Sequence, residues 1–191
     1  TGTLTYGTPR VAAVESVEPN LSRENLYALA AGAEDRSEHP LGKAIISCCK
    51  KSGAQLTAAK NFQMIPGRGV CAEVESRTVL AGNPELLREH GIEMESPAEA
   101  EAHIRQGCTI TYIAMDGMFA GFLALSDTLR QESAATIDAL SRLGVQPVLL
   151  TGDHENAAGT IAAKLHINTV RANCLPEDKL KYIGEYQAKG M

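Results

Sequence analysis

The chain has 191 residues, 44% of them hydrophobic and 21% charged, so it can bury one sizeable core or two small ones. Its formal net charge of −5 gives no general attraction to nucleic acid or to anionic membranes, and we expect no nucleic-acid partner. No apolar run approaches the roughly twenty residues that cross a bilayer, which predicts a soluble chain. The five cysteines lack metal-ligand spacing, so no metal site is predicted.

The first half of the chain predicts two helices followed by a small antiparallel sheet. Ser22 can cap a helix over 23–33, and Pro40 suits the first position of a second helix that runs toward Gly53. The expected buried stripe of the second helix is Leu41, Ala44, Ile45 and Cys48. Strand-like runs follow at 61–65, 70–74 and 78–80, and short helices are expected at 84–90 and 97–106.

The pattern changes after a hairpin signal. Asp116-Gly117 lies between apolar runs at 109–115 and 118–125, which is typical of a hairpin. After Asp127 the sequence predicts alternating helices and strands: a helix over 131–143, a buried strand over 145–150, a helix after Asp153, a strand over 169–172 and a helix from Glu177. The first five residues have no place in the antiparallel part. We therefore expect one domain to be inserted into another.

Several short motifs could hold phosphate in the second part. Thr151-Gly152-Asp153 follows an apolar strand and precedes a helix, where a hydroxyl and turn N–H groups can bind phosphoryl oxygens. Thr3 lies in Thr1-Gly2-Thr3-Leu4-Thr5, and Lys179 follows Pro176-Glu177-Asp178. Taken singly, these segments also fit a strand and turn, a helix cap and an exposed cation.

Between these motifs lies Ser37-Glu38-His39-Pro40-Leu41, with Glu34 five residues before His39. Gly67-Arg68-Gly69-Val70 and Gly82-Asn83 follow in order. Together the motifs resemble the heavy-metal-transporting subfamily of the P-type ATPases. The opening five residues resemble the tail of that family's Asp-Lys-Thr-Gly-Thr-Leu-Thr signature, whose phosphorylated Asp would lie two positions before Thr1.

The resemblance implies an α/β (α+β overall) fold. An antiparallel-sheet nucleotide-binding domain with flanking helices, residues 9–124, would be inserted into an incomplete haloacid-dehalogenase-like Rossmannoid phosphorylation domain, residues 1–8 and 125–191. The implied roles are adenine contact for Glu34 and His39, and the rest of the nucleotide pocket for Gly67, Gly69, Val70, Gly82 and Asn83. Thr3, Thr151, Gly152, Asp153 and Lys179 would form the phosphate site, and Asp127 would belong to a hinge.

The implied function is ATP binding and phosphoryl delivery in an ATP-driven transition-metal pump that uses ATP and Mg²⁺. The expected partners are ATP and the membrane helices and metal-binding domains of the same polypeptide, and this segment would be a cytosolic portion that binds nucleotide without turnover. The stretch 151–156 favours zinc, cadmium or cobalt over copper. Two alternatives remain: a haloacid-dehalogenase-type phosphatase with residues 9–124 as its cap, and a nucleotide-sensing module.

Overall fold

The computed structural model describes residues 2–53, 56–152 and 155–188. By their internal contacts these residues form two compact units. We call residues 8–103 and 108–126 the sheet unit. We call residues 2–7, 104–107 and the described residues from 127 onward the terminal unit. Each is described by itself.

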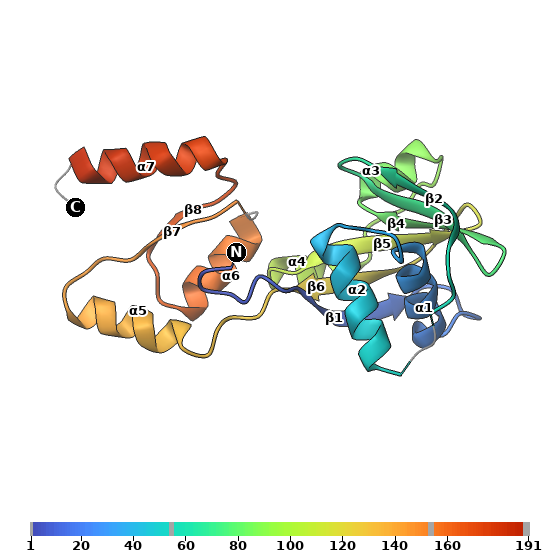
Figure 1. Ribbon diagram of the computed structural model, residues 1–191, viewed down its shortest axis with the longest axis horizontal. Helices are drawn as coiled ribbons and strands as arrows, with labels where there is room; N and C mark the ends of the chain where they lie inside the picture. The colour runs from blue at the N-terminus through green and yellow to red at the C-terminus, as the bar shows by residue number, and fades with distance from the viewer. Residues whose placement is uncertain (1, 54–55, 153–154, 189–191) are drawn as a thin grey trace. The chain divides into compact units, whose positions relative to one another are not determined.

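The sheet unit is built on six antiparallel strands in the order β1-β6-β5-β4-β3-β2 (Figure 1). Their bounds are β1 (Arg10–Ser16), β2 (Lys60–Ile65), β3 (Gly69–Val74), β4 (Arg77–Gly82), β5 (Thr109–Met115) and β6 (Met118–Ser126). The first strand pairs with the last, so Arg10 lies opposite Ser126. The chain therefore enters and leaves this unit at paired residues.

The turns between neighbouring strands explain why they form hairpins. Asp116 and Gly117 have φ of +50° and +83°, the left-handed conformation that a two-residue turn between antiparallel strands requires. The predicted Asp-Gly hairpin is confirmed. Glu75 and Ser76 adopt the same conformation between β3 and β4, with φ of +53° and +63°. Neither is a glycine, so this turn is less evident from the sequence.

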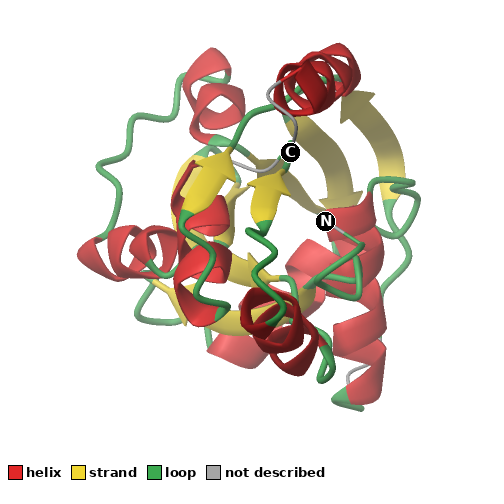
Figure 2. Ribbon diagram, turned by 90° about the vertical axis from the view of Figure 1, so that its left-hand side faces the viewer, coloured by secondary structure: helices red, strands yellow, loops and turns green. Residues whose placement is uncertain are grey.

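Helices cover both faces of the sheet (Figures 1 and 2). On one face lie α1 (Arg23–Ala33) and α2 (Pro40–Lys51), and on the other lie α3 (Pro84–Glu89) and α4 (Ala98–Arg105). Successive side chains of a strand point to opposite faces, so Ile113 packs under α1 and α2 whereas Tyr112 packs under α3 and α4. Both faces of the central strands are consequently apolar.

The second helix differs from the prediction in one respect. Its buried residues are Gly42, Ala44, Ile45 and Cys49, whereas Leu41 and Cys48 are only half-buried. The buried stripe is therefore rotated from the predicted one. Gly42 lies on this buried face, where an added β-carbon would clash with the carboxyl group of Glu34 and with the hydroxyl of Ser37.

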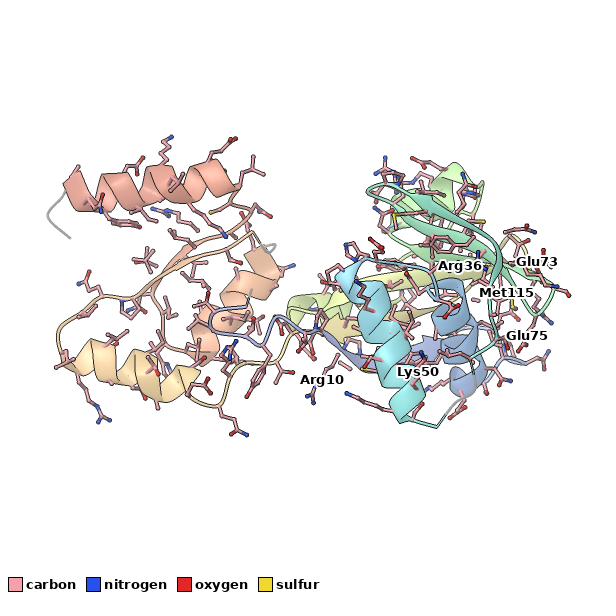
Figure 3. All side chains as sticks on the ribbon, viewed as in Figure 1. Arg10, Arg36, Lys50, Glu73, Glu75 and Met115 are labelled. Atoms are coloured by element: carbon pink, nitrogen blue, oxygen red, sulfur yellow. The ribbon has the colours of Figure 1, made fainter. Side chains whose placement is uncertain are left out.

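The edge strand β2 carries mostly exposed side chains. Near it, Asn61 Nδ2 donates to Glu73 Oε2 at 2.9 Å, and Thr57 Oγ1 donates to Glu75 Oε1 at 2.9 Å. Figure 3 shows Glu73 and Glu75 at this side of the sheet. Polar and charged side chains on an edge strand oppose the addition of a further strand from another molecule.

The terminal unit contains a parallel pair of strands, β7 (Val148–Leu150) and β8 (Thr169–Arg171). Its helices are α5 (Ser133–Arg142), α6 (Glu155–Lys164) and α7 (Pro176–Ala188). Residues 2–6 join this unit through a bridge between Thr5 and Leu129. The small core is formed by Ile137, Ala162, Leu165 and Ile167.

The predicted buried strand over 145–150 is wrong in extent and burial. The strand begins only at Val148, its three residues are half-buried, and Val145 is 49% exposed. Pro147 directly precedes the strand and has no N–H to donate to a neighbouring strand, which explains the late start.

Among the described residues, no helix is long and apolar enough to cross a membrane.

A substitution at Gly121 tests how closely the sheet is packed. It has φ of +151°, and an added β-carbon would lie 2.1 Å from the Glu15 carbonyl oxygen and 2.7 Å from Leu26 Cδ2. Because backbone cannot move aside cheaply, we expect Gly121→Ala to lower the free energy of unfolding by about 2–4 kcal/mol. Urea denaturation measures this loss.

The control is Gly117→Ala in the turn between β5 and β6. Gly117 also has positive φ, but an added β-carbon there meets nothing within 4 Å. This variant should lose only about 1 kcal/mol from backbone strain. Equal losses for the two variants would contradict the close approach at Gly121.

Candidate functional site

The sheet unit has a cavity of about 270 Å³ beside the ends of several of its elements. Its lining side chains and backbone come from the loop between α1 and α2, the turn between β2 and β3, the start of α3 and the start of β5. The cavity brings together Glu34, His39, Gly67, Gly69, Val70, Gly82 and Asn83, the seven residues that the sequence assigned to one pocket. Ordinary ligand pockets have volumes of about 300–1,000 Å³, and the volume of this cavity is slightly smaller. The cavity therefore suits a single flat ring system with a small attachment.

His39 caps the second helix. It has extended backbone, φ −66° and ψ 139°, and Pro40 takes the first helical position. Its Nδ1 accepts a hydrogen bond from the backbone N–H of Leu41 at 3.2 Å. An accepting Nδ1 needs its lone pair, so the proton of the neutral ring is on Nε2. His39 is exposed and is one of the residues that line the cavity.

Glu34 is the unusual group of the cavity. It follows the last residue of α1 and is only 6% exposed. Burial raises the pKa of its carboxyl group, and a hydrogen bond with Ser37 only partly opposes this effect. Its Oε2 is buried and has no hydrogen-bond partner in the described part of the chain. A buried acceptor without a partner favours a ligand that can donate to it.

Gly42 makes room for that carboxyl group. A β-carbon at position 42 would clash with Glu34 Oε2 and lie 2.7 Å from Ser37 Oγ. The sequence reasoning missed this residue. A glycine inside a helix costs about 1 kcal/mol relative to alanine and usually has a packing reason, and that signal was present in Pro40-Leu41-Gly42.

The turn at Gly67 forms another wall of the cavity. Gly67 has φ of +71°, and Arg68 N donates to Ile65 O at 3.0 Å, which closes the turn after Pro66. Asn83 then fixes the turn to the third helix, because its Nδ2 donates to Gly67 O at 3.0 Å. Its Oδ1 also caps α3 by accepting from Leu86 N at 3.0 Å.

Gly69 and Gly82 lie opposite each other in the pairing of β3 with β4. An added β-carbon would lie 2.2 Å from Ala81 O at position 69 and 2.3 Å from Arg68 O at position 82. The sheet itself therefore requires both glycines. Their contact with a ligand stays a prediction.

A second, smaller hollow of about 80 Å³ lies in the terminal unit. It is lined by Thr3, Leu4, Thr5, Leu149, Leu150, Thr151, Ile161 and Lys179. The structure thus brings Thr3, Thr151 and Lys179 together from three separate segments. Among the described residues of this lining, Lys179 is the only charged one, which favours an anion.

The other predicted residues of the terminal unit are placed differently. Gly152 is exposed and does not line the hollow, and Asp153 falls outside the described residues. Asp127 follows β6, and both of its carboxylate oxygens are buried without a hydrogen-bond partner in the described chain. Its assignment to a hinge stays a prediction.

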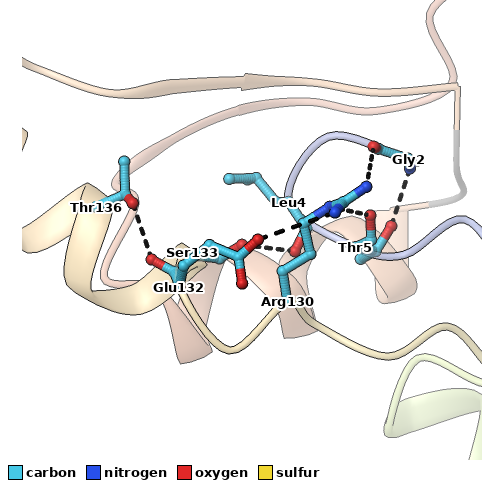
Figure 4. A network of polar contacts seen from close by, with 7 residues as sticks. All are labelled: Gly2, Leu4, Thr5, Arg130, Glu132, Ser133 and Thr136. Atoms are coloured by element: carbon cyan, nitrogen blue, oxygen red, sulfur yellow. Dashed lines mark hydrogen bonds and ion pairs between the residues drawn. The ribbon is translucent and has the colours of Figure 1, made fainter.

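Arg130 holds residues 2–6, some of which line this hollow, through hydrogen bonds to their backbone (Figure 4). Its Nε donates to Thr5 O at 3.1 Å and its Nη2 donates to Gly2 O at 3.3 Å. The guanidinium also lies 5.2 Å from the centre of the Tyr6 ring. Residues 2–6 are thereby tied to residues more than 120 positions away in the sequence.

Serine and backbone groups add to this attachment. Ser133 Oγ donates to Leu4 O at 2.8 Å, Arg130 N donates to Leu4 O at 2.9 Å, and Tyr6 N donates to Thr128 O at 3.0 Å. Ser133 was not singled out in the sequence, and Arg130 was noted only as the end of the hinge-like segment 127–130. Both act through backbone carbonyls, which leave no trace in side-chain motifs.

A larger hollow of about 420 Å³ lies along α2, where Lys50 is labelled in Figure 3. Its lining residues are Lys43, Ile46, Ser47, Lys50 and Lys51. All come from one helix, so the hollow is an open surface and not a built site. Among the described residues, no three His, Cys, Asp or Glu side chains converge as metal ligands would.

The comparison with protein families covers both units. A family model described as haloacid dehalogenase-like hydrolase matches residues 1–191. The chain belongs to the haloacid dehalogenase-like hydrolase family. This member is 36% identical over 188 residues to a copper-exporting P-type ATPase of Staphylococcus haemolyticus, with 98% of this chain and 23% of that protein covered. The chain thus spans less than a quarter of the length of this relative.

Two solved structures resemble the haloacid dehalogenase-like chain over almost all of its length. A zinc-transporting PIB-type ATPase in an E2.Pi state is 32% identical with a TM-score of 0.79, covering 99% of this chain and 30% of that one. The catalytic domain of the CPx-ATPase CopB-B, described for its conformational changes on nucleotide binding, is 25% identical with a TM-score of 0.72, covering 100% and 66%. The expected resemblance to heavy-metal P-type ATPases and the expected fold class are confirmed.

The buried carboxyl of this haloacid dehalogenase-like chain predicts a pH dependence. Burial raises the pKa of Glu34 in the folded state above that in the unfolded chain, so the folded state binds the proton more tightly. Its contribution to stability is therefore complete below about pH 4 and is lost as pH rises through the raised pKa. We expect Glu34→Gln to become more stable relative to the unchanged chain as pH rises from 4 to 8.

Urea denaturation at several pH values measures this difference. Glu38→Gln, at an exposed carboxyl in the same loop, is the matched control and should show no such trend. Parallel stability curves for Glu34→Gln and the unchanged chain would contradict the raised pKa.

A further prediction concerns Arg130. Arg130→Gln removes the two guanidinium hydrogen bonds to Thr5 O and Gly2 O. Each bond contributes about 1 kcal/mol, so we expect hydrogen exchange of the Tyr6 amide to accelerate by at least about fivefold. Arg142→Gln, at an exposed position in the last turn of α5, should leave this exchange unchanged. Slow exchange in both variants would show that Arg130 does not hold the segment.

Proposed function

We propose that this chain is the ATP-binding part of a heavy-metal-transporting P-type ATPase. In this proposal the sheet unit is the nucleotide-binding domain and the terminal unit is part of the phosphorylation domain. One observation carries it: a cavity of nucleoside size is lined by an exposed imidazole and by a buried carboxyl whose Oε2 has no hydrogen-bond partner among the described residues. The resemblance to a catalytic domain described for nucleotide binding supports it.

The chemistry of the cavity suits adenine. A purine ring can stack on the imidazole of His39, and its exocyclic amino group can donate to Glu34 Oε2. The amino group would satisfy the buried acceptor, which no described residue does. Gly67 would let the turn after β2 approach the ligand closely, because no side chain stands in the space.

The terminal unit would receive the phosphoryl group. Thr3, Thr151 and Lys179 surround the small hollow, and a lysine there offsets the repulsion between a carboxylate nucleophile and an incoming phosphate. We propose Asp153 and Gly152 as neighbours of that site. The segments near 7–9 and 125–130, including Asp127, would be hinges between the two units.

Magnesium would accompany the nucleotide. Mg²⁺ usually keeps several waters and binds through phosphates with one or two carboxylates, and the described residues contain no cluster of three ligand side chains. The adenine contacts proposed above, to His39 and Glu34, involve no metal. We propose that ATP binds this chain with or without Mg²⁺.

The whole protein would pump a transition-metal ion, with this part on the cytosolic side and membrane helices and metal-binding domains in the same polypeptide. The related proteins carry copper or zinc in their names, so they favour no single metal. We keep zinc, cadmium or cobalt ahead of copper on the residues of 151–156 alone. The phosphatase alternative is less well supported, because the pump relatives match the inserted residues as well.

The proposal is tested by calorimetric titration of ATP into His39→Asn. Asparagine is a good helix cap, so this variant keeps an acceptor for Leu41 N and loses only the ring. Stacking contributes about 1–3 kcal/mol per base, so we expect ATP affinity to fall about tenfold or more. A His39→Gln variant should lose affinity similarly.

His166→Asn is the matched control. His166 lies in the terminal unit with φ of +54°, a conformation that asparagine tolerates. ATP affinity equal to that of the unchanged chain is expected for this control. If His39→Asn also binds ATP unchanged, the imidazole is not part of the site and the proposed function loses its main support.

A further inference from the structure

Among the described residues that line the cavity of the sheet unit, Arg68 is the only Lys or Arg. The lining also includes Glu34, whose charge would oppose an anion, and His39. A nucleoside needs no cation, whereas a nucleoside triphosphate carries several negative charges. The guanidinium of Arg68, which is permanently charged, is therefore suited to distinguish the two.

The backbone of Arg68 is held firmly in place. Its N–H closes the turn by donating to Ile65 O at 3.0 Å, and its carbonyl accepts from Asn83 N at 2.9 Å. A β-carbon at Gly82 would lie 2.3 Å from that same carbonyl oxygen. The turn cannot move freely, so any change at this position has to occur in the side chain.

The side chain is held only weakly. Its Nε donates to Glu89 Oε1 at 2.9 Å, and the side chains of Arg68 and Glu89 are 39% and 51% exposed. Glu89 is the last residue of α3, whose first turn is capped by Asn83. Exposed ion pairs contribute little because water screens both charges. Little free energy is therefore needed for the guanidinium of Arg68 to leave the Glu89 carboxylate and bind a more highly charged phosphate.

We propose that Arg68 exchanges its ion pair with Glu89 for the phosphates of a bound nucleotide and makes the site prefer nucleoside phosphates over nucleosides. The cavity of about 270 Å³ would hold the base and ribose, which leaves the phosphates at its rim. Glu89 competes for the guanidinium and sets how strongly the phosphates are bound. This inference rests on the nucleotide site proposed above.

The test compares ATP with adenosine by calorimetric titration into this chain. We expect Arg68→Gln to weaken ATP binding about fivefold and to leave adenosine binding unchanged. Glu89→Gln frees the guanidinium, so ATP binding should become about two- to fivefold tighter. In the double variant, ATP affinity should equal that of Arg68→Gln, because the carboxylate then has no guanidinium to withhold.

Two controls separate charge from structure. Glu93→Gln removes the same charge at an exposed position a few residues beyond α3 and should not tighten ATP binding. Arg68→Lys keeps the charge without the planar fork and should retain most of the preference for ATP over adenosine. Adenosine binding reports in every variant that the cavity is still folded.

The outcomes are distinct. If Arg68→Gln weakens ATP and adenosine equally, Arg68 acts through the turn and the inference is wrong. No tightening in Glu89→Gln also overturns it. A third outcome is that adenosine binds the unchanged chain, that His39→Asn loses this binding, and that Arg68→Gln does not weaken ATP binding. That outcome would leave the proposed function intact and reject only the role of Arg68. If neither ATP nor adenosine binds the unchanged chain, both proposals fail.

Discussion

The burial of both faces of β5 and β6 is the constraint on which the sheet unit depends. Neighbouring side chains of a strand point to opposite faces, so Phe122 and Leu123 enter different cores although they are adjacent in the sequence. Each face then has to be covered by helices, which fixes α1 and α2 on one side and α3 and α4 on the other. The candidate cavity lies where these elements end, since the sheet centre leaves no room for it.

Glu34 is the main departure from this apolar arrangement. Its carboxyl group is buried, its pKa is raised, and one oxygen has no partner in the described chain. Such a group lowers the stability of the folded state. The carboxyl group lies between the end of α1 and Gly42, where there is no room for a larger side chain at position 42. Stability is reduced at the position where we propose ligand contact.

The sequence predicted the elements well where local chemistry decides them. The cap at Ser22, the proline at the first position of α2 and the Asp116-Gly117 turn placed helices and strands within a few residues of their observed bounds. It failed where tertiary contacts decide. The buried stripe of α2 includes Gly42, which packs against Glu34. The shortened β7 is a different case, because Pro147 is visible in the sequence and its effect on the start of the strand was overlooked.

The candidate site divides in the same way. The motif residues that resemble a known family were found from the sequence, and the structure places all seven of the nucleotide set around one cavity. The pairing of Arg68 with Glu89 and the attachment made by Arg130 were not foreseen. Each joins residues distant in the sequence through a carboxylate or a backbone carbonyl, and a single sequence carries no sign of such pairs.

The pairing of Arg10 with Ser126 has a consequence for the entropic cost of folding. Arg130 and Thr5 are 125 positions apart, so joining them in an unfolded chain means closing a long loop. Once β1 and β6 have paired, the two ends of the sheet unit are already adjacent, and the remaining loop is only a few residues long. Closure entropy grows with the logarithm of loop length, so prior folding of the sheet unit reduces this cost by about 2 kcal/mol. The pairing of β1 with β6 therefore lowers the entropic cost of joining residues 2–6 to residues 128–133.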